Sequence, residues 1–115
     1  MRIPTIENKF RSDVYSSDKS LKEVSYANLV FKYIDTDDLI SMYHILKLEL
    51  CDANKCYELE KEKYSFIHHS AKKGRLNCFK LLSMLGTDIQ LQDMKNLKPM
   101  DYATIYKNVK YNFIF

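Results

Sequence analysis

Glycine and proline are scarce in this sequence, and that scarcity limits the folds that the chain can adopt. The 115 residues include Gly 2 and Pro 2. An all-β sandwich or barrel needs many tight turns, and these two residue types supply most of them. Two glycines also cannot build a glycine-rich phosphate-binding loop. The composition therefore predicts a mainly helical chain, and its length suits one domain.

The first half of the chain has helical spacing of apolar residues with one interruption. Between residues 21 and 34 these residues fall three or four positions apart. Asp37 or Asp38 is expected to cap a second helix, where a carboxylate accepts hydrogen bonds from free N–H groups. Residues 51–56 should form a loop, and the charged residues 57–63 either extend the next helix or form an irregular connection. We expect residues 1–22 to form a loosely ordered or capping arm, followed by one domain over residues 23–115.

The second half carries clearer helix boundaries. Ser65 can cap a short helix that opens at Phe66. Gly74 can end this helix, because glycine adopts the left-handed conformation at little energetic cost. Gly86 can end a second helix in the same way. Pro99 suits the first position of a third helix, where the missing N–H group is no loss.

Segments of the chain repeat at a fixed distance. Residues 66–70 and 99–103 both open a helix and lie 33 positions apart. Residues 40–46 match residues 76–82 at a spacing of 36. A period near 33 with two short helices is typical of ankyrin repeats. Over residues 65–103, the sequence resembles the ankyrin-repeat family.

The resemblance rests on named motif positions. Residues 65–74 are similar to the family motif T-P-L-H-x-A-A-x-x-G, and residues 86–88 to G-A-D. Asn96 stands where the family has a glycine, and asparagine tolerates a positive φ better than most residues. The resemblance implies an all-α helical repeat solenoid of about two and a half repeats, with a short β-hairpin finger near residues 87–97. It implies a structural role in hydrogen bonding for His68. The residues to which it gives a structural role are Ser65, His68, Gly74, Gly86, Asp88, Asp93, Asn96 and Pro99.

The same resemblance implies a non-catalytic protein–protein interaction module that binds through the finger and the concave helix face. Met94 and Leu97 would be apolar residues on a finger tip, unless Leu97 packs under the finger and Met94 is a tolerated exposed residue. Lys72 and Lys73 form a basic cluster with Arg75, or simply a solvated helix end. The expected partner-binding residues are His69, Lys72, Lys73, Gln92, Met94, Lys95, Leu97, Tyr102 and Tyr106.

No combination of residues indicates an enzyme, a metal site or a cofactor. Cys51 and Cys56 have a C-x4-C spacing, whereas zinc sites usually have closer, repeated pairs. His68 and His69 are adjacent, so they cannot both lie on one helix face. A Cys–His catalytic pair lacks a recognisable nucleophile motif. We therefore expect a protein partner and no small-molecule substrate.

The net charge and the amino-acid composition leave two alternative functions open. The net charge is +3, with 9 tyrosines, which would suit a nucleic-acid-binding accessory protein. The tyrosines are spread through helices rather than set on one platform, so nucleic acid is the less favoured partner. A bias towards Lys, Asn, Ile and Phe is typical of AT-rich genomes and would suit a host-interaction adaptor of a parasite or virus. Without a visible signal peptide or membrane span, and with reduced thiols, we expect an intracellular protein, cytoplasmic or nuclear.

Overall fold

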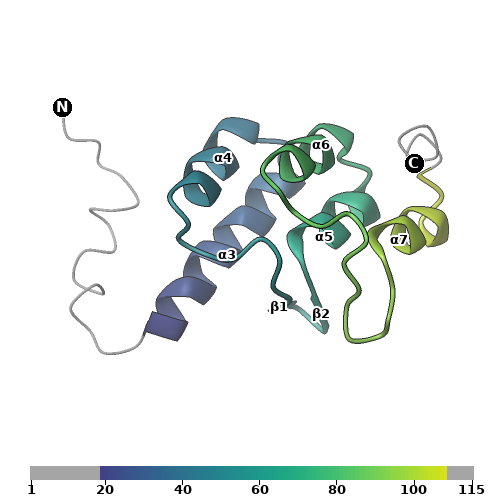
Figure 1. Cartoon of the computed structure of the whole chain (residues 1–115), viewed down its shortest axis with the longest axis horizontal. Helices are drawn as coiled ribbons and strands as arrows, with labels where there is room; N and C mark the ends of the chain where they lie inside the picture. The colour runs from purple at the N-terminus through teal and green to yellow at the C-terminus, as the bar shows by residue number, and fades with distance from the viewer. Residues whose placement is uncertain (1–18, 109–115) are drawn as a thin grey trace.

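The computed structural model describes residues 19–108, which form a mostly helical fold with one short hairpin. No helix of this described part is both long and apolar enough to cross a bilayer. Along the chain the elements are α3 (Lys19–Asp35), α4 (Leu39–Lys47), β1 (Tyr57–Leu59), β2 (Glu62–Tyr64), α5 (Phe66–Lys73), α6 (Leu76–Met84) and α7 (Pro99–Ile105) (Figure 1).

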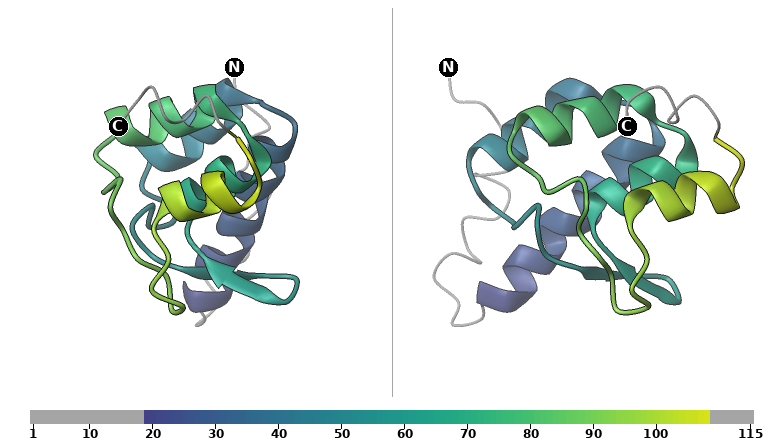
Figure 2. Two further views of the ribbon diagram at one scale, coloured as in Figure 1. Left: turned by 90° about the vertical axis from the view of Figure 1, so that its right-hand side faces the viewer. Right: turned by 45° about the vertical axis from the view of Figure 1, so that its right-hand side comes forward.

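Two helix pairs lie side by side, and α5 is at their centre. Helix α5 packs against α3, α6 and α7, while α4 packs against both α3 and α6. The helices of the α3–α5–α7 row thus contact one another in order, and α4 and α6 form a second row. The β1–β2 hairpin and the loop between α6 and α7 project from the same end of the helices (Figures 1 and 2).

The helix boundaries follow the local chemistry that the sequence predicts. Asp38 caps α4, since its Oδ1 atom accepts a hydrogen bond from the Ser41 N–H at 3.1 Å. Helix α5 begins after Ser65 and ends at Gly74, which has a φ of 73°. Helix α7 begins at Pro99. The expected boundary at residue 22 falls inside α3, and the rest of the expected arm, residues 1–18, lies outside the described residues.

The core joins the hairpin to the helices through aromatic rings. Phe31 of α3 lies against Phe66 of α5, with ring centroids 5.0 Å apart and the rings edge to face. Tyr57 of β1 stacks on Phe66 at 5.6 Å. Tyr64 of β2 is buried beside Phe31. Edge-to-face and offset-stacked rings are favourable arrangements, so the hairpin is an integral part of the core.

The predicted position of the hairpin is wrong. Residues 87–97 contain no strand, and their backbone forms turns instead. The two strands lie at residues 57–64, where the sequence left a helical extension and an irregular connection open. Tyr57 pairs with Tyr64 across the hairpin, so both rings enter the core from one face. Because strands place both rings on the same face and bury them, strands are favoured over a helix in residues 57–64, although most of the residues between the tyrosines are charged.

Candidate functional site

The loop before α7 is closed around the carboxylate of Asp93. The Asp93 Oδ1 atom accepts hydrogen bonds from the backbone N–H groups of Lys95 and Leu97, both at 2.9 Å. Its Oδ2 atom accepts a hydrogen bond from the Tyr102 hydroxyl. Burial raises the pKa of Asp93, but these three donors outweigh burial and hold the pKa below its usual value. Asn96 completes the turn with a φ of 63°, as its place in the motif predicts.

His68 fixes the same loop to α5. Its Nε2 atom lies 2.8 Å from the carbonyl oxygen of Leu97, which can only accept. The Nε2 atom therefore carries the proton, and Nδ1 is the acceptor for Ser65, whose Oγ atom is 2.7 Å away. Burial lowers the pKa of His68 and favours this neutral form. The expected structural role of His68 thus has a defined geometry.

The predicted finger residues differ in their exposure. Met94 is 72% exposed, and Gln92 and Lys95 are also exposed. Leu97 is half-buried and packs against the core, which is the alternative that the sequence left open for it. The loop therefore presents one large apolar side chain on a backbone that α5 and α7 hold in place.

Lys72 links α5 to β2 and to the end of α7. Its Nζ atom donates a hydrogen bond to Glu62 of β2. The same ammonium lies 5.5 Å from the Tyr64 ring centroid and 5.3 Å from that of Tyr106. Burial lowers the pKa of Lys72, but the Glu62 carboxylate outweighs burial and the pKa ends above its usual value. Lys72 stays charged but is neutralised internally, while Lys73 is exposed.

Two residues expected to face a partner are instead buried. His69 is 1% exposed, because its Nδ1 atom lies 2.6 Å from the Tyr64 hydroxyl and its Nε2 atom 2.7 Å from Asp35 Oδ1. Tyr102 is 3% exposed, because its hydroxyl binds Asp93 and its ring packs on His68. Both side chains hold the fold together, so the predicted exposure of His69 and Tyr102 is wrong. Tyr106 is 46% exposed and lies at the surface beside Lys72.

The other motif residues form turns. Gly86 has a φ of 99° after α6. Asp88 accepts a hydrogen bond from the Gln90 N–H at 2.9 Å, and its own N–H donates to Asn54 at 2.9 Å. Sequence reasoning missed Glu62 and Asn54, which contact Lys72 and Asp88, 10 and 34 positions further along the chain. For Glu62, the available signal was a pair of tyrosines, Tyr57 and Tyr64, on either side of six mostly charged residues.

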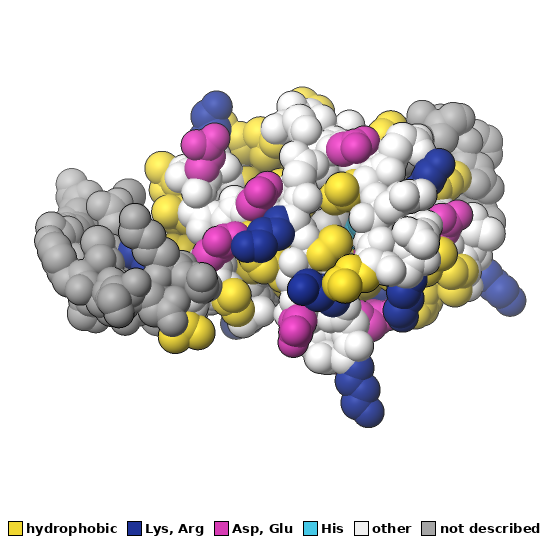
Figure 3. Space-filling model, turned by 60° about the horizontal axis from the view of Figure 1, so that its bottom comes forward, with side chains coloured by type: hydrophobic (Ala, Val, Ile, Leu, Met, Phe, Trp, Pro, Cys, Tyr) yellow, Lys and Arg dark blue, Asp and Glu magenta, His cyan; other side chains and the backbone are white. Residues whose placement is uncertain are grey.

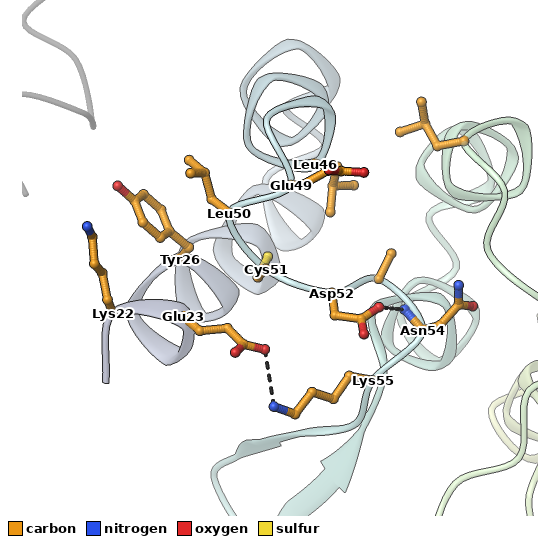
Figure 4. Close-up of a pocket in the computed structure, with 12 residues that line it drawn as sticks. Lys22, Glu23, Tyr26, Leu46, Glu49, Leu50, Cys51, Asp52, Asn54 and Lys55 are labelled. Atoms are coloured by element: carbon orange, nitrogen blue, oxygen red, sulfur yellow. Dashed lines mark hydrogen bonds and ion pairs between the residues drawn. The ribbon is translucent and has the colours of Figure 1, made fainter. Parts of the chain in front are cut away.

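A second candidate is the groove between α3 and the loop that follows α4, with a volume of about 760 Å³. Figure 4 shows Glu23 and Lys55 pointing toward each other there, and their charged atoms are 3.2 Å apart. Glu23 also accepts a hydrogen bond from the Tyr57 hydroxyl. Burial raises the pKa of the Cys51 thiol in this groove to about 12, so this thiol is not an activated nucleophile. Glu23, Lys55 and Tyr57 thus pair with one another at the edge of this groove.

The same considerations apply to the remaining thiols and carboxylates of the described residues. Burial raises the pKa of the Cys78 thiol to about 12 as well. Within residues 19–108, no three His, Cys, Asp or Glu side chains gather closely enough to hold a metal ion. Met94 is thus a large exposed apolar side chain on a loop whose backbone Asp93 and His68 hold in place.

No family model matches the chain, and no curated protein matches it.

Proposed function

We propose that this chain is a non-catalytic protein–protein interaction module of the ankyrin-repeat type. The packing of the helices supports this assignment: α3, α5 and α7 contact one another in sequence within one row, and α4 and α6 contact each other in a second row. Each pair of helices in such an array buries its apolar face against the next pair. The hydrogen bonds of His68 to Ser65 and to the loop that precedes the next helix also fit the role that the motif gives this residue.

The exposure of Met94 on an anchored turn is the observation that carries the proposal. A large apolar side chain that is 72% exposed gains from being covered. Its backbone is already ordered by Asp93 and His68, so little conformational entropy remains to be lost on binding. Tyr106, at the end of α7, offers a second partly exposed ring. We propose that the partner covers Met94 and the surface from there to Tyr106.

The structure offers a matched pair of surfaces for the test. The finger variant Met94→Ala/Lys95→Glu removes the apolar tip and reverses one charge. The control variant Met84→Ala/Lys80→Glu makes the same changes on α6, where Met84 is 81% exposed and Lys80 is exposed. Both variants should retain the helical circular dichroism of the wild type.

Affinity capture from cells that express the chain, followed by quantitative mass spectrometry, gives the readout. We expect the finger variant to retain its specific partner about tenfold less well than the wild type, as is typical of an interface anchor. The control variant should retain that partner fully. Equal retention by the finger variant and the wild type would show that the partner binds elsewhere.

A further inference from the structure

The groove between α3 and the loop after α4 lies at the α3 end of the row of helices. Its lining residues come from α3, the end of α4, the loop that follows and Leu85 at the end of α6, and none comes from α5 or α7. Neither Met94 nor Tyr106 lines it, so it is separate from the proposed binding site. Its volume of about 760 Å³ matches pockets that enclose a whole small ligand, and one side chain would not fill it.

Half of the residues that line this groove are hydrophobic. They are Tyr26, Leu46, Leu50, Cys51, Ala53 and Leu85. Leu85 is 36% exposed, and Leu50 and Ala53 are half-buried. An occupant that brings apolar side chains would remove these groups from water, which is favourable.

Charge does not decide what fills the groove. Its charged lining residues include both signs, and Glu23 is already paired with Lys55 at 3.2 Å. Figure 3 shows the same mixture on the face from which the hairpin and the loop project, where Lys and Arg side chains lie among Asp and Glu. The groove therefore selects its occupant by apolar groups and by proximity.

The sequence immediately before α3 has a matching apolar pattern. Residues 1–18 directly precede Lys19, the first residue of α3, and the groove begins at Lys22. Hydrophobic residues in this segment recur three or four positions apart, as on one face of a helix. These residues are Ile3, Ile6, Phe10 and Val14, which we call the apolar stripe. All residues between them except Pro4 are polar.

The connection between the apolar stripe and α3 is long enough to reverse the chain. Residues 15–18 are Tyr-Ser-Ser-Asp, and antiparallel helices are joined by loops of about two to five residues. Serine and aspartate also favour turns. A segment of the same chain is present at the groove at an effective concentration on the order of millimolar. It therefore has an advantage over a free ligand of similar apolar content.

We propose that the apolar stripe binds in the groove between α3 and the loop after α4 and caps this end of the helix row. In stacked helix pairs the terminal pair has no neighbouring pair on one side, so it needs a cap. The cap would close the groove to other ligands and leave the Met94 loop accessible. This inference goes beyond the proposed function and does not depend on the partner at Met94.

Photo-crosslinking of the full chain tests the proposal directly. Phe10→p-benzoylphenylalanine places a photoreactive group on the apolar stripe, and mass spectrometry identifies the residues to which it attaches. We expect attachment within one chain to residues 46–55 or to Leu85. Ser12→p-benzoylphenylalanine is the matched control, because position 12 lies on the opposite side of a helix from the stripe. It should attach far less to the same residues.

A pair of substitutions at the end of α6 tests the groove itself. Leu85→Glu puts a charge among the apolar lining residues, so it should lower the crosslinking from position 10 severalfold. Met84→Glu makes the same change one residue earlier, where the side chain is 81% exposed and does not line the groove. It should leave the crosslinking unchanged. Circular dichroism checks that both variants keep the helicity of the wild type.

The other outcomes would overturn the inference. Attachment within one chain to a different surface would show that the apolar stripe binds elsewhere. Crosslinks between two copies, visible as a dimer on a denaturing gel, would favour a second copy of this chain as the partner of the stripe. Equal crosslinking in Leu85→Glu and Met84→Glu would exclude the groove. None of these results would change the expected loss of partner in Met94→Ala/Lys95→Glu, so failure of the cap and failure of the proposed function are distinguishable.

Discussion

Gly74 occupies a position where two separate requirements exclude a side chain. Its φ of 73° is in the left-handed region, which costs an alanine about 1 kcal/mol or more. A Cβ atom there would also lie 2.8 Å from Asn108 Oδ1. Asn108 cannot easily turn away, because its amide donates to the carbonyl oxygens of Ala71 at 2.7 Å and Lys72 at 3.1 Å. The end of α5 and the residues after α7 are therefore coupled.

A double-mutant cycle measures this coupling. Gly74→Ala should lower the free energy of unfolding by about 2 kcal/mol or more. In an Asn108→Ala background the same substitution should be less damaging, because the steric conflict is gone. Urea denaturation of the two single variants and the double variant gives the coupling energy. A Gly86→Ala cycle with Asn108→Ala is the control and should be additive, since nothing lies within 4 Å of a Cβ atom at Gly86.

For single residues, the sequence predicts roles that depend on neighbouring positions but not contacts with partners far along the chain. Gly74 as a helix end, Ser65 as a cap and His68 as a hydrogen-bonding residue are all local or motif features, and the structure agrees with each. Asn108 has no local signal, because its partners lie 36 and 37 positions earlier. His69 was expected at the surface for the same reason, because its partner Asp35 is 34 positions away and gives no local signal of burial.

Among the elements, the hairpin and the Asp93 loop are held by side chains rather than by long backbone ladders. Each strand has three residues, which is too short for a stable isolated hairpin. The hairpin persists because Tyr57 and Tyr64 pack on the helices. Three-residue strands leave only a weak pattern in a sequence, so residues 57–64 were not predicted to be strands. The hairpin was expected near residues 87–97 because the family resemblance implied it there. Helices of seven to 17 residues repeat their apolar spacing over more positions, so the sequence predicted them.

The Asp93 loop gives a prediction for one element. Asp93→Ala leaves the Tyr102 hydroxyl and two backbone N–H groups without their acceptor, so we expect the free energy of unfolding to fall by about 2–3 kcal/mol. Amide hydrogen exchange at Lys95 and Leu97 should speed up, even where α3 and α4 remain protected. Asp88→Ala is the matched control, because Asp88 makes a similar turn on an exposed site and should cost less than about 1 kcal/mol. Unchanged exchange at Lys95 in Asp93→Ala would contradict the role of the carboxylate.

For the whole molecule, two neutral histidines on α5 connect the helices to the hairpin and the loop. His68 binds the loop through Leu97, and His69 binds α3 through Asp35 and β2 through Tyr64. Burial lowers the pKa of both histidines below the 6.5 of an unperturbed side chain, although Asp35 and the Leu97 carbonyl work in the opposite direction. The stability of the fold therefore depends on the protonation of both rings.

This arrangement predicts that the protein is less stable in mild acid. The unfolded chain binds protons at His68 and His69 near pH 6.5, while the folded chain binds them only at lower pH. Stability is thus complete above that pH and falls as the pH drops through the folded pKa values, by up to about 1.4 kcal/mol per pH unit for each histidine. Urea denaturation between about pH 7.5 and pH 5 measures this slope. The slope should shrink in a His68→Gln/His69→Gln variant and persist in the exposed-residue control His44→Gln, and a flat wild-type profile would rule out the histidine effect.

At the largest scale, the predicted helical class is correct in its coarse form, and the packing order is what the sequence could not supply. Helical periodicity and capping residues predict the helices within each half of the chain, but not how the two halves pack together. The contact of α5 with α3 depends on Phe31, Phe66 and His69 meeting across more than 30 positions. Exposure was hardest to predict, since His69 and Met94 are both near lysines in the sequence but are 1% and 72% exposed.

The burial of two of the three cysteines makes the third a natural reporter. Cys51 and Cys78 are buried, whereas Cys56 is only partly buried and precedes β1. Asp93 is close enough to raise the pKa of Cys56, although burial is the larger cause. A raised pKa slows the reaction of a thiol, but Cys56 is the least buried of the three cysteines, so a maleimide dye should still attach there first. The unaltered chain thus supplies its own fluorescent labelling position for following events at the Asp93 loop in real time.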